Sequence, residues 1–227
     1  MARPTLLLFL LILPPTICQA NEESRWQFEV LLDNKIIGDH QFTVTDTDLE
    51  RTVVSAASFD VKVLFLNLYR YRHANTERWQ GDCLRSIETT TDANGKSFAV
   101  SGEALENEFI VTTLEQRNSL NGCVMTFAYW DRDFLEQPRL INAQTGEYES
   151  VNVREPQEDT VRFNNVELPA YRVQLETKKG ALSIWYGTED NRWLALESIT
   201  RDGRKLSYRP VKLPEIEMKT RLSSIGY

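Results

Sequence analysis

Cysteine and histidine, the residues that most often bind zinc, are scarce in this sequence. The chain of 227 residues has three cysteines and two histidines. Cys83 and Cys123 belong to no C-x-x-C pair, and His40 and His73 are far apart along the chain. A zinc site built from these four residues would therefore lack the usual ligand spacing. We expect no metal and no cofactor.

Motifs of the common enzyme classes are also missing. The sequence has no G-x-S-x-G of a serine hydrolase, no G-x-G-x-x-G of a dinucleotide site, no H-E-x-x-H of a zinc protease and no calcium-binding loop. A G-K-S triplet occurs at Gly95–Ser97, but Thr90 stands where a phosphate-binding loop has its first glycine. These absences favour a protein that is not an enzyme.

Long basic runs and long hydrophobic runs are absent after the first 20 residues. Without that segment the chain has 25 basic and 33 acidic residues, a net charge of −8. An acidic chain without a lysine-rich run lacks the usual surface for nucleic acid. No later run approaches the roughly 20 apolar residues of a membrane-spanning helix. We therefore expect neither a nucleic-acid partner nor a transmembrane span after residues 1–20 are removed.

Residues 1–20 have the three parts of a secretory signal peptide. A basic start precedes a short apolar core, two prolines end that core, and small residues stand at Cys18 and Ala20. An uncleaved membrane anchor is the alternative, but the apolar core is too short to span a bilayer. A lipoprotein attached at Cys18 is a second alternative, and the bulky Ile17 argues against it. We predict cleavage after Ala20 and a location in the periplasm or outside the cell.

From Trp26 onward, apolar and polar residues alternate, as in strands with one buried face. Turn sequences such as Asp33–Asn34 and Asn94–Gly95 separate the alternating runs. Roughly ten hairpin-linked strands follow from this spacing, one of them over residues 123–130. Asp131 or Asp133 is expected to cap a short helical turn that Pro138 ends, and Gly38 to mark a bulge or a close approach of another strand.

These patterns predict a mainly β protein with at most one or two short helices. Strand–helix–strand alternation is missing, so the sheet is antiparallel, and it must curl to bury one face. We expect one long, curved sheet, a half-barrel or open barrel, over residues 21–213. A flexible tail over residues 214–227 would follow it.

Removal of the signal peptide would leave two cysteines, Cys83 and Cys123, in an oxidising compartment. We predict that they form a disulfide. The chain-entropy model gives such a bond a stabilisation of roughly 3 to 4 kcal/mol for a loop of about 40 residues.

The segment over residues 64–83 concentrates aromatic, arginine and histidine residues. In a strand, alternate residues point to opposite faces. Tyr69, Tyr71, His73 and Trp79 would then share one face, and the neighbouring arginines would lie on the other. The aromatic face is either core or the wall of a ligand pocket, because tyrosine and tryptophan join an apolar body to a polar tip.

Three functions remain open. The first is binding of a hydrophobic or amphipathic, lipid-like envelope molecule by the curved sheet, with ligand contacts from Tyr69, Tyr71, His73, Trp79, Tyr129 and Trp185. The second is an enzyme acting on a lipid or glycan, with His73 and Glu77 as weak acid–base candidates and Glu88 or Asp60 as closer acids on other strands. The third is an assembly module whose exposed sheet edges pair with a protein partner.

Three stretches carry a resemblance to a known family: residues 64–84 (LFLNLYRYRHANTERWQGDCL), 123–130 (CVMTFAYW) and 140–148 (LINAQTGEY). They resemble an uncharacterised family of exported bacterial proteins, described as a domain of unknown function. Residues 33–44 and 184–209 are more distantly similar to another uncharacterised periplasmic β-sheet family. The resemblance implies export in a Gram-negative bacterium, with Cys83 and Cys123 as the family's cysteines, and it implies no activity.

Overall fold

The computed structural model describes residues 22–63 and 66–215. The predicted signal peptide and nearly all of the predicted tail lie outside these residues, so both stay predictions. Part of the aromatic segment, residues 64–65, also lies outside them.

The described chain is almost entirely β-structure, with a single 3-10 helix, η1, over Arg132–Glu136. The strands are β1 (Glu22–Leu32), β2 (Lys35–Asp46), β3 (Arg51–Val63), β4 (Leu66–Gln80), β5 (Cys83–Ala93), β6 (Lys96–Ala104), β7 (Glu108–Thr113), β8 (Arg117–Asn121), β9 (Arg139–Ile141), β10 (Tyr148–Val153), β11 (Gln157–Phe163), β12 (Val166–Thr177), β13 (Gly180–Gly187), β14 (Trp193–Ile199) and β15 (Lys205–Lys212).

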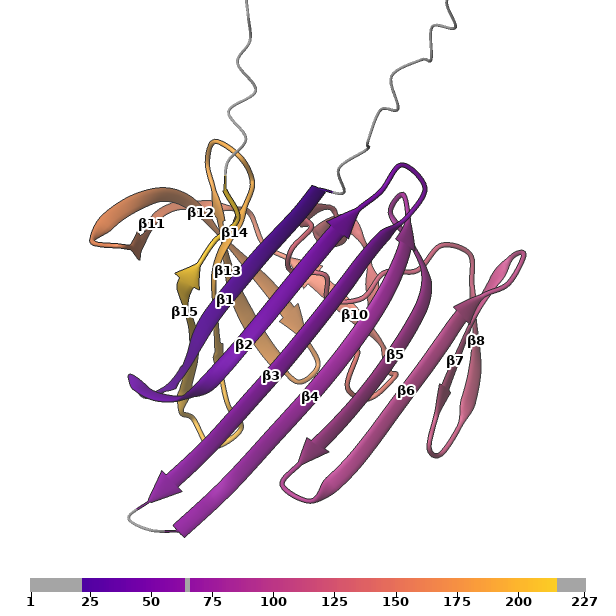
Figure 1. Ribbon diagram of the computed structural model, residues 1–227, viewed down its shortest axis with the longest axis horizontal. Coiled ribbons are helices and arrows are strands. Elements are labelled where there is room, and N and C mark those ends of the chain that lie inside the picture. Colours follow the sequence, from indigo (N-terminus) through magenta and orange to yellow (C-terminus); the bar gives the residue numbers. More distant parts are fainter. Residues whose placement is uncertain (1–21, 64–65, 216–227) are drawn as a thin grey trace, which may run out of the picture.

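All strands belong to one antiparallel sheet with the order β8-β7-β6-β5-β4-β3-β2-β1-β15-β14-β13-β12-β10-β9, and β11 pairs with β12. Figure 1 shows β1 to β8 as a broad layer, with β10, β12 and β13 behind it. The sheet therefore curls back over its own inner face without closing, since no pairing joins β8 to β9 within the described residues. The predicted single curved antiparallel sheet is confirmed.

The predicted hairpins form because their turn residues tolerate positive φ angles. Asp33 and Asn34 have φ angles of 49° and 66°, and Asn94 and Gly95 have φ angles of 56° and 88°. Gly38 marks a close approach of two backbones, as expected: a Cβ atom added there would lie 1.8 Å from the Ser58 carbonyl oxygen.

The strand predicted over residues 123–130 is wrong. Of that run, Thr126 alone makes a β-bridge, a parallel one to Ile141. The run belongs to a segment, residues 122–147, that we call the inner segment. It lies between the two arms of the sheet, one formed by β1 to β8 and the other by β10 to β15 (Figure 1). Val124 accepts a backbone hydrogen bond from Leu84, and Trp130 stacks edge-on against Trp79 of β4. Apart from β9, which pairs with β10, its apolar residues are buried by the surrounding sheet and not in a strand ladder.

The helical turn predicted at Asp131 is confirmed. The Asp131 carboxylate accepts a hydrogen bond from the backbone N–H of Asp133, which caps η1. Tyr129, just before it, has a carbonyl that accepts a hydrogen bond from the Tyr186 hydroxyl of β13 over 3.1 Å. The inner segment is thus tied to strands on both arms of the sheet.

The disulfide between Cys83 and Cys123 is present, with its Cα atoms 5.0 Å apart. It joins the start of β5 to the start of the inner segment, next to the backbone hydrogen bond between Leu84 and Val124. The prediction of this pairing is confirmed.

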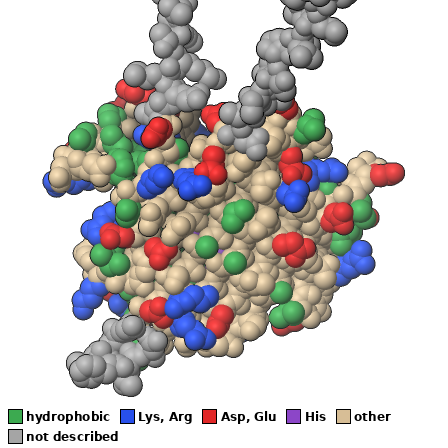
Figure 2. Space-filling model, in the orientation of Figure 1, with side chains coloured by type: hydrophobic (Ala, Val, Ile, Leu, Met, Phe, Trp, Pro, Cys, Tyr) green, Lys and Arg blue, Asp and Glu red, His purple; other side chains and the backbone are tan. Residues whose placement is uncertain are grey.

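The arginines of β4 point to the outer face, as the alternation predicts. Arg70 pairs with Asp92 and Arg72 with Asp60, each over 2.6 Å. Figure 2 shows acidic and basic side chains interspersed over this side of the molecule, with small scattered hydrophobic groups. Exposed ion pairs of this kind contribute little stability and mainly keep the outer face hydrated.

Candidate functional site

A cavity of about 1230 Å³ opens at one mouth of the curved sheet. Its wall combines apolar and aromatic residues, chiefly of β1 to β4 and β15, with polar and charged residues of β6, of residues 113–116 and 142–147, and of the turns that carry Lys179 and Arg204. Six of the residues that form this wall are Ile37, Ala57, Phe59, Val61, Tyr71 and Leu206.

The wall follows from the alternation and register of β3 and β4. Phe59 pairs with Tyr71, and Val61 pairs with Tyr69, so all four side chains point inward. The Phe59 and Tyr71 rings are stacked, with centroids 5.2 Å apart. Tyr69 is 39% exposed at the opening, whereas Phe59 is 8% and Ala57 4% exposed. The cavity wall on β3 therefore lies deeper below the protein surface at Ala57 than at Val61.

One end of the inner segment forms a side of the cavity. The Tyr71 hydroxyl donates a hydrogen bond to Oε1 of Gln144 over 3.0 Å. Gly146 adopts a φ angle of 71°, and a Cβ atom there would lie 2.6 Å from the Thr113 side chain of β7. This loop, residues 142–147, is therefore packed between β4 and β7.

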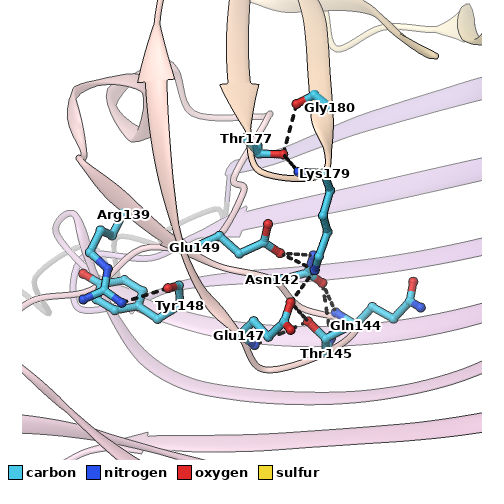
Figure 3. Close-up of polar contacts among 10 residues, drawn as sticks. All are labelled: Arg139, Asn142, Gln144, Thr145, Glu147, Tyr148, Glu149, Thr177, Lys179 and Gly180. Atoms are coloured by element: carbon cyan, nitrogen blue, oxygen red, sulfur yellow. Dashed lines mark hydrogen bonds and ion pairs between the residues drawn. The ribbon is translucent and has the colours of Figure 1, made fainter. Parts of the chain in front are cut away.

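A polar cluster surrounds the same loop (Figure 3). Lys179, in the turn between β12 and β13, pairs with Glu147 and with Glu149, the latter over 2.9 Å. Asn142 donates a hydrogen bond to Glu149 over 2.8 Å. The hydrogen bond from Lys179 lowers the pKa of Glu147. The cavity thus has a charged rim in addition to its apolar wall.

Both histidines point inward on the same cross-strand row, in which His40, Ala57, His73 and Thr91 are successive register partners. Burial lowers the pKa of His73 to about 4. Burial, and to a smaller extent His73, lowers the pKa of His40 to about 3. Both rings are therefore neutral at neutral pH.

The two histidines differ in their hydrogen bonds and in their relation to the cavity. His73 Nδ1 lies 2.8 Å from the Thr91 hydroxyl, and His73 is not among the described residues that line the cavity. His40 does line it, and its Nδ1 lies 3.1 Å from the Tyr208 hydroxyl. Nε2 of His40 is buried and has no hydrogen-bond partner among the described residues.

Glu77 lies on the same face of β4 as His73 but belongs to a separate buried group. Its carboxylate accepts hydrogen bonds from Asn75 Nδ2 over 2.9 Å and from Trp79 Nε1 over 3.0 Å. Burial raises the pKa of this carboxyl group. No hydrogen bond or ion pair joins Glu77 to His73 within the part of the chain that the structure describes.

The two acids proposed as closer partners of His73 lie elsewhere. Asp60 pairs with Arg72 on the outer face, and Glu88 is exposed. Among the described residues, no acid forms a hydrogen bond or ion pair with the His73 ring, so the arrangement gives catalysis at this residue no support.

The predicted ligand contacts divide into wall and core. Tyr69 and Tyr71 line the cavity. Trp79 is fully buried beneath Trp130. Tyr129 packs on Trp193 with ring centroids 5.4 Å apart, and Trp185 is buried and donates a hydrogen bond to Asp159. The last three are core residues here, and their role as ligand contacts stays a prediction.

A second, smaller cavity of about 700 Å³ lies at the other mouth. Arg51 occupies its wall, pairs with Asp46 and with Asp131, and stacks over Trp130. Charged side chains make up much of this wall, among them Arg132, Asp133 and Glu136, so the smaller cavity is more polar than the larger one.

Two further features concern residues 22–63 and 66–215, a metal site and a membrane span. Within these ranges, no three His, Cys, Asp or Glu side chains are grouped as metal ligands would be. The same residues include no helix that is long and apolar enough to cross a membrane.

Sequence reasoning did not single out His40 and Tyr208 as site residues. A signal for His40 was available, since it alternates with Phe42 and Val44 and so shares their inward face. No comparable signal exists for Tyr208, because it lies on a strand far away in the sequence. Only the pairing of β1 with β15 places it beside Val30 and near His40.

Comparisons with known proteins agree with the fold and assign no activity. A crystal structure described as a "Beta-barrel-like Protein of Domain of Unknown Function DUF1849 from Brucella abortus" is similar to this chain, with a TM-score of 0.60. The similarity covers 84% of this chain and 96% of that chain at 11% sequence identity, so it shows the fold alone. No curated protein matches the sequence. Residues 28–211 match the family described as "Domain of unknown function (DUF6134)".

Proposed function

We propose that this chain, which belongs to the DUF6134 family of unknown function, is a non-enzymatic binding protein for a hydrophobic or amphipathic, lipid-like molecule. The observation that carries the proposal is the cavity of about 1230 Å³ with its wall of Phe59, Val61 and Tyr71. Ligand sites are typically concave and mostly apolar, with a few polar groups that orient the ligand.

The two parts of the cavity favour an amphipathic ligand over a purely polar one. The wall on β3 and β4 offers apolar and aromatic surface, whose burial against a ligand is favourable by about 25 cal/mol per Å². The rim offers charged groups, among them Lys179 and Glu147. An apolar portion would lie along the wall, and a polar portion would face the rim and solvent.

The periplasm or the outside of the cell is the location we propose, and the ligand would then be a molecule of the cell envelope. Two observations support this. Residues 1–20 have the pattern of a signal peptide, and Cys83 and Cys123 are paired as a disulfide. Disulfides persist in oxidising compartments and are rare in the cytosol.

The test compares one substitution on the two faces of a single strand. Val61→Asp puts a carboxylate into the cavity wall, while Val54→Asp puts it on the outer face of β3, where Val54 is 47% exposed. The probe is the uncharged dye Nile red, whose fluorescence rises in apolar surroundings. The protein is the chain from residue 21 to residue 227.

We expect the wild-type protein and Val54→Asp to bind Nile red with equal affinity. Val61→Asp should bind it at least about tenfold more weakly, because an unpaired charge in the wall opposes an apolar ligand. If the dye does not bind the wild-type protein, or binds both variants equally well, the proposed function is wrong.

The two other functions stay predictions without an observation that favours them. An enzyme with acid–base chemistry at His73 would need an acid at its ring, and the recorded hydrogen bond of that ring is to Thr91. An assembly module would need a long free edge, whereas β8 and β9 span five and three residues and β11, which pairs only with β12 among the described strands, spans seven.

A further inference from the structure

The deep end of the cavity contains two polar side chains in largely apolar surroundings. His40 of β2 and Tyr208 of β15 both line the cavity, and His40 Nδ1 lies 3.1 Å from the Tyr208 hydroxyl. Ala57, the register partner of His40 on β3, is 4% exposed. Its small side chain fills little of the space beside the imidazole. These two polar groups therefore lie where the wall is deepest.

The hydrogen bonding of this pair is incomplete. Nε2 of His40 is buried with no partner among the described residues, and an unpaired buried polar group lowers stability. Tyr208 has one recorded side-chain partner, His40, although a phenol hydroxyl can donate one hydrogen bond and also accept. The pair therefore has spare capacity for hydrogen bonds that the described protein does not use.

Among the described residues, no charged side chain has a hydrogen bond, ion pair or ring contact with His40 or Tyr208. Charged residues such as Lys179 and Arg204 line the same cavity but pair with Glu147 and Asp33. The rings that contact His40 are those of Phe42, Phe59 and Tyr208. The titratable group that acts on it is His73, which is neutral at neutral pH. A charged ligand group brought to this depth would lose its hydration without gaining a counter-ion, which is strongly unfavourable. An uncharged hydrogen-bonding group would have no such cost.

We propose that His40 and Tyr208 are the polar anchor of the cavity, and that the ligand carries an uncharged hydroxyl or carbonyl group at the end that enters deepest. This inference rests on the proposed function and defines its ligand more narrowly. Tyr208 lines the cavity and can bond the ligand directly. Nε2 of His40 is shielded in the ligand-free protein, so its bond requires the imidazole to rotate as the ligand enters.

The test uses three small probes that share a ring system: naphthalene, 2-naphthol and 2-naphthoate. Each is titrated against the protein from residue 21 to residue 227 loaded with Nile red, and its dissociation constant is obtained from dye displacement. 2-Naphthol is less hydrophobic than naphthalene, so a wall without polar partners would favour naphthalene. The sign of the preference therefore reports whether a hydrogen bond is formed.

We expect the wild-type protein to bind 2-naphthol about tenfold more tightly than naphthalene, and 2-naphthoate more weakly than 2-naphthol. His40→Leu and Tyr208→Phe should each remove or reverse the preference for 2-naphthol over naphthalene. Tyr208→Phe keeps the ring and removes only the hydroxyl, so the test does not depend on the folding of His40→Leu alone. His73→Leu, on the same row but outside the cavity, should keep the preference.

Three outcomes would overturn the anchor. The first is a wild-type protein that binds naphthalene as tightly as 2-naphthol. The second is a preference that survives in both His40→Leu and Tyr208→Phe. The third is loss of the preference for 2-naphthol in His73→Leu to the same extent as in His40→Leu and Tyr208→Phe. In all three cases Nile red still binds, and the proposed function stands. Failure of Nile red to bind the wild-type protein would overturn the proposed function and the anchor together.

Discussion

Trp79 donates its indole N–H to the buried carboxylate of Glu77, two residues earlier on β4, with 3.0 Å between Nε1 and Oε2. Asn75 donates to the other oxygen of the same carboxylate over 2.9 Å. The three side chains form a row on the inward face of β4 beneath the inner segment. Burial raises the pKa of Glu77 despite these hydrogen bonds.

Replacement of Glu77 by glutamine should change how stability depends on pH. Because the folded pKa of Glu77 is raised above its unfolded value of about 4.5, its contribution is complete below that value. The contribution is then lost as pH rises through the folded pKa. The free energy of unfolding of Glu77→Gln, measured with urea, should therefore increase relative to wild type as pH rises from 4.5 to 8.

The control is Glu88→Gln, which changes an exposed glutamate on β5. The change with pH should be larger for Glu77→Gln than for this control, because Glu77 is buried and Glu88 is exposed. A constant difference for Glu77→Gln, or one that falls as pH rises, would show that the pKa of Glu77 is not raised by folding.

Loss of the disulfide should lower the stability of the whole chain. Cys83 and Cys123 close a loop with a sequence separation of 40 residues, for which the chain-entropy model gives roughly 3 to 4 kcal/mol. The double variant Cys83→Ser, Cys123→Ser should unfold in guanidinium with a free energy lower by about this amount. Wild-type protein with a reductant should match the variant. A difference below about 1 kcal/mol would contradict the prediction.

The hydroxyl of Tyr71 should hold the loop over residues 142–147 in place. Tyr71→Phe removes the hydrogen bond to Gln144 and should cost about 1 kcal/mol. Amide hydrogen exchange in that loop should become faster. Tyr69→Phe is the matched control, since the Tyr69 hydroxyl has no recorded hydrogen bond to a described residue, and it should leave both measurements unchanged. Equal effects of the two substitutions would disprove the role of this hydrogen bond.

Gly38 should tolerate alanine worse than a turn glycine does. A Cβ atom at Gly38 would lie 1.8 Å from the Ser58 carbonyl oxygen, so the β2 and β3 backbones would have to move apart. Gly95→Ala meets no atom within 4 Å and is strained only by its φ angle of 88°, at about 1 kcal/mol. Thermal unfolding should show the larger loss for Gly38→Ala. The reverse order would mean that this close approach does not exist.

Much of the sheet could be predicted from the sequence because its determinants are local. Alternation assigns Tyr71 and Arg72 to opposite faces of β4, and Asn94–Gly95 fixes a hairpin whatever surrounds it. The pairing of Cys83 with Cys123 needed only the count of cysteines and an expected compartment.

The inner segment could not be predicted because its burial depends on the curvature of the whole sheet. A continuous apolar run such as residues 123–130 has the same composition whether it pairs as a strand or is surrounded by other strands. Contact with the inner segment also decides which residues of the aromatic face of β4 are core. Trp79 is core because Trp130 covers it, whereas Tyr69 and Tyr71, on the same face, line the open mouth.

The sequence predicts only part of the site, because the rest depends on contacts between residues far apart in the chain. Its β4 wall follows from alternation, but the anchor pairs His40 with a tyrosine 168 residues later in the chain. Only the junction of β1 with β15, which joins the two arms of the sheet, brings these residues together.

The central claim is that the larger cavity holds a lipid-like molecule, and native mass spectrometry of the natively produced protein tests it most directly. The protein should be isolated without detergent from the cells that produce it. We predict a population heavier than the polypeptide by one non-covalently bound molecule, lost on organic extraction and greatly reduced in Val61→Asp but not in Val54→Asp. A polypeptide mass alone, in a protein that also takes up no added Nile red, would contradict the account.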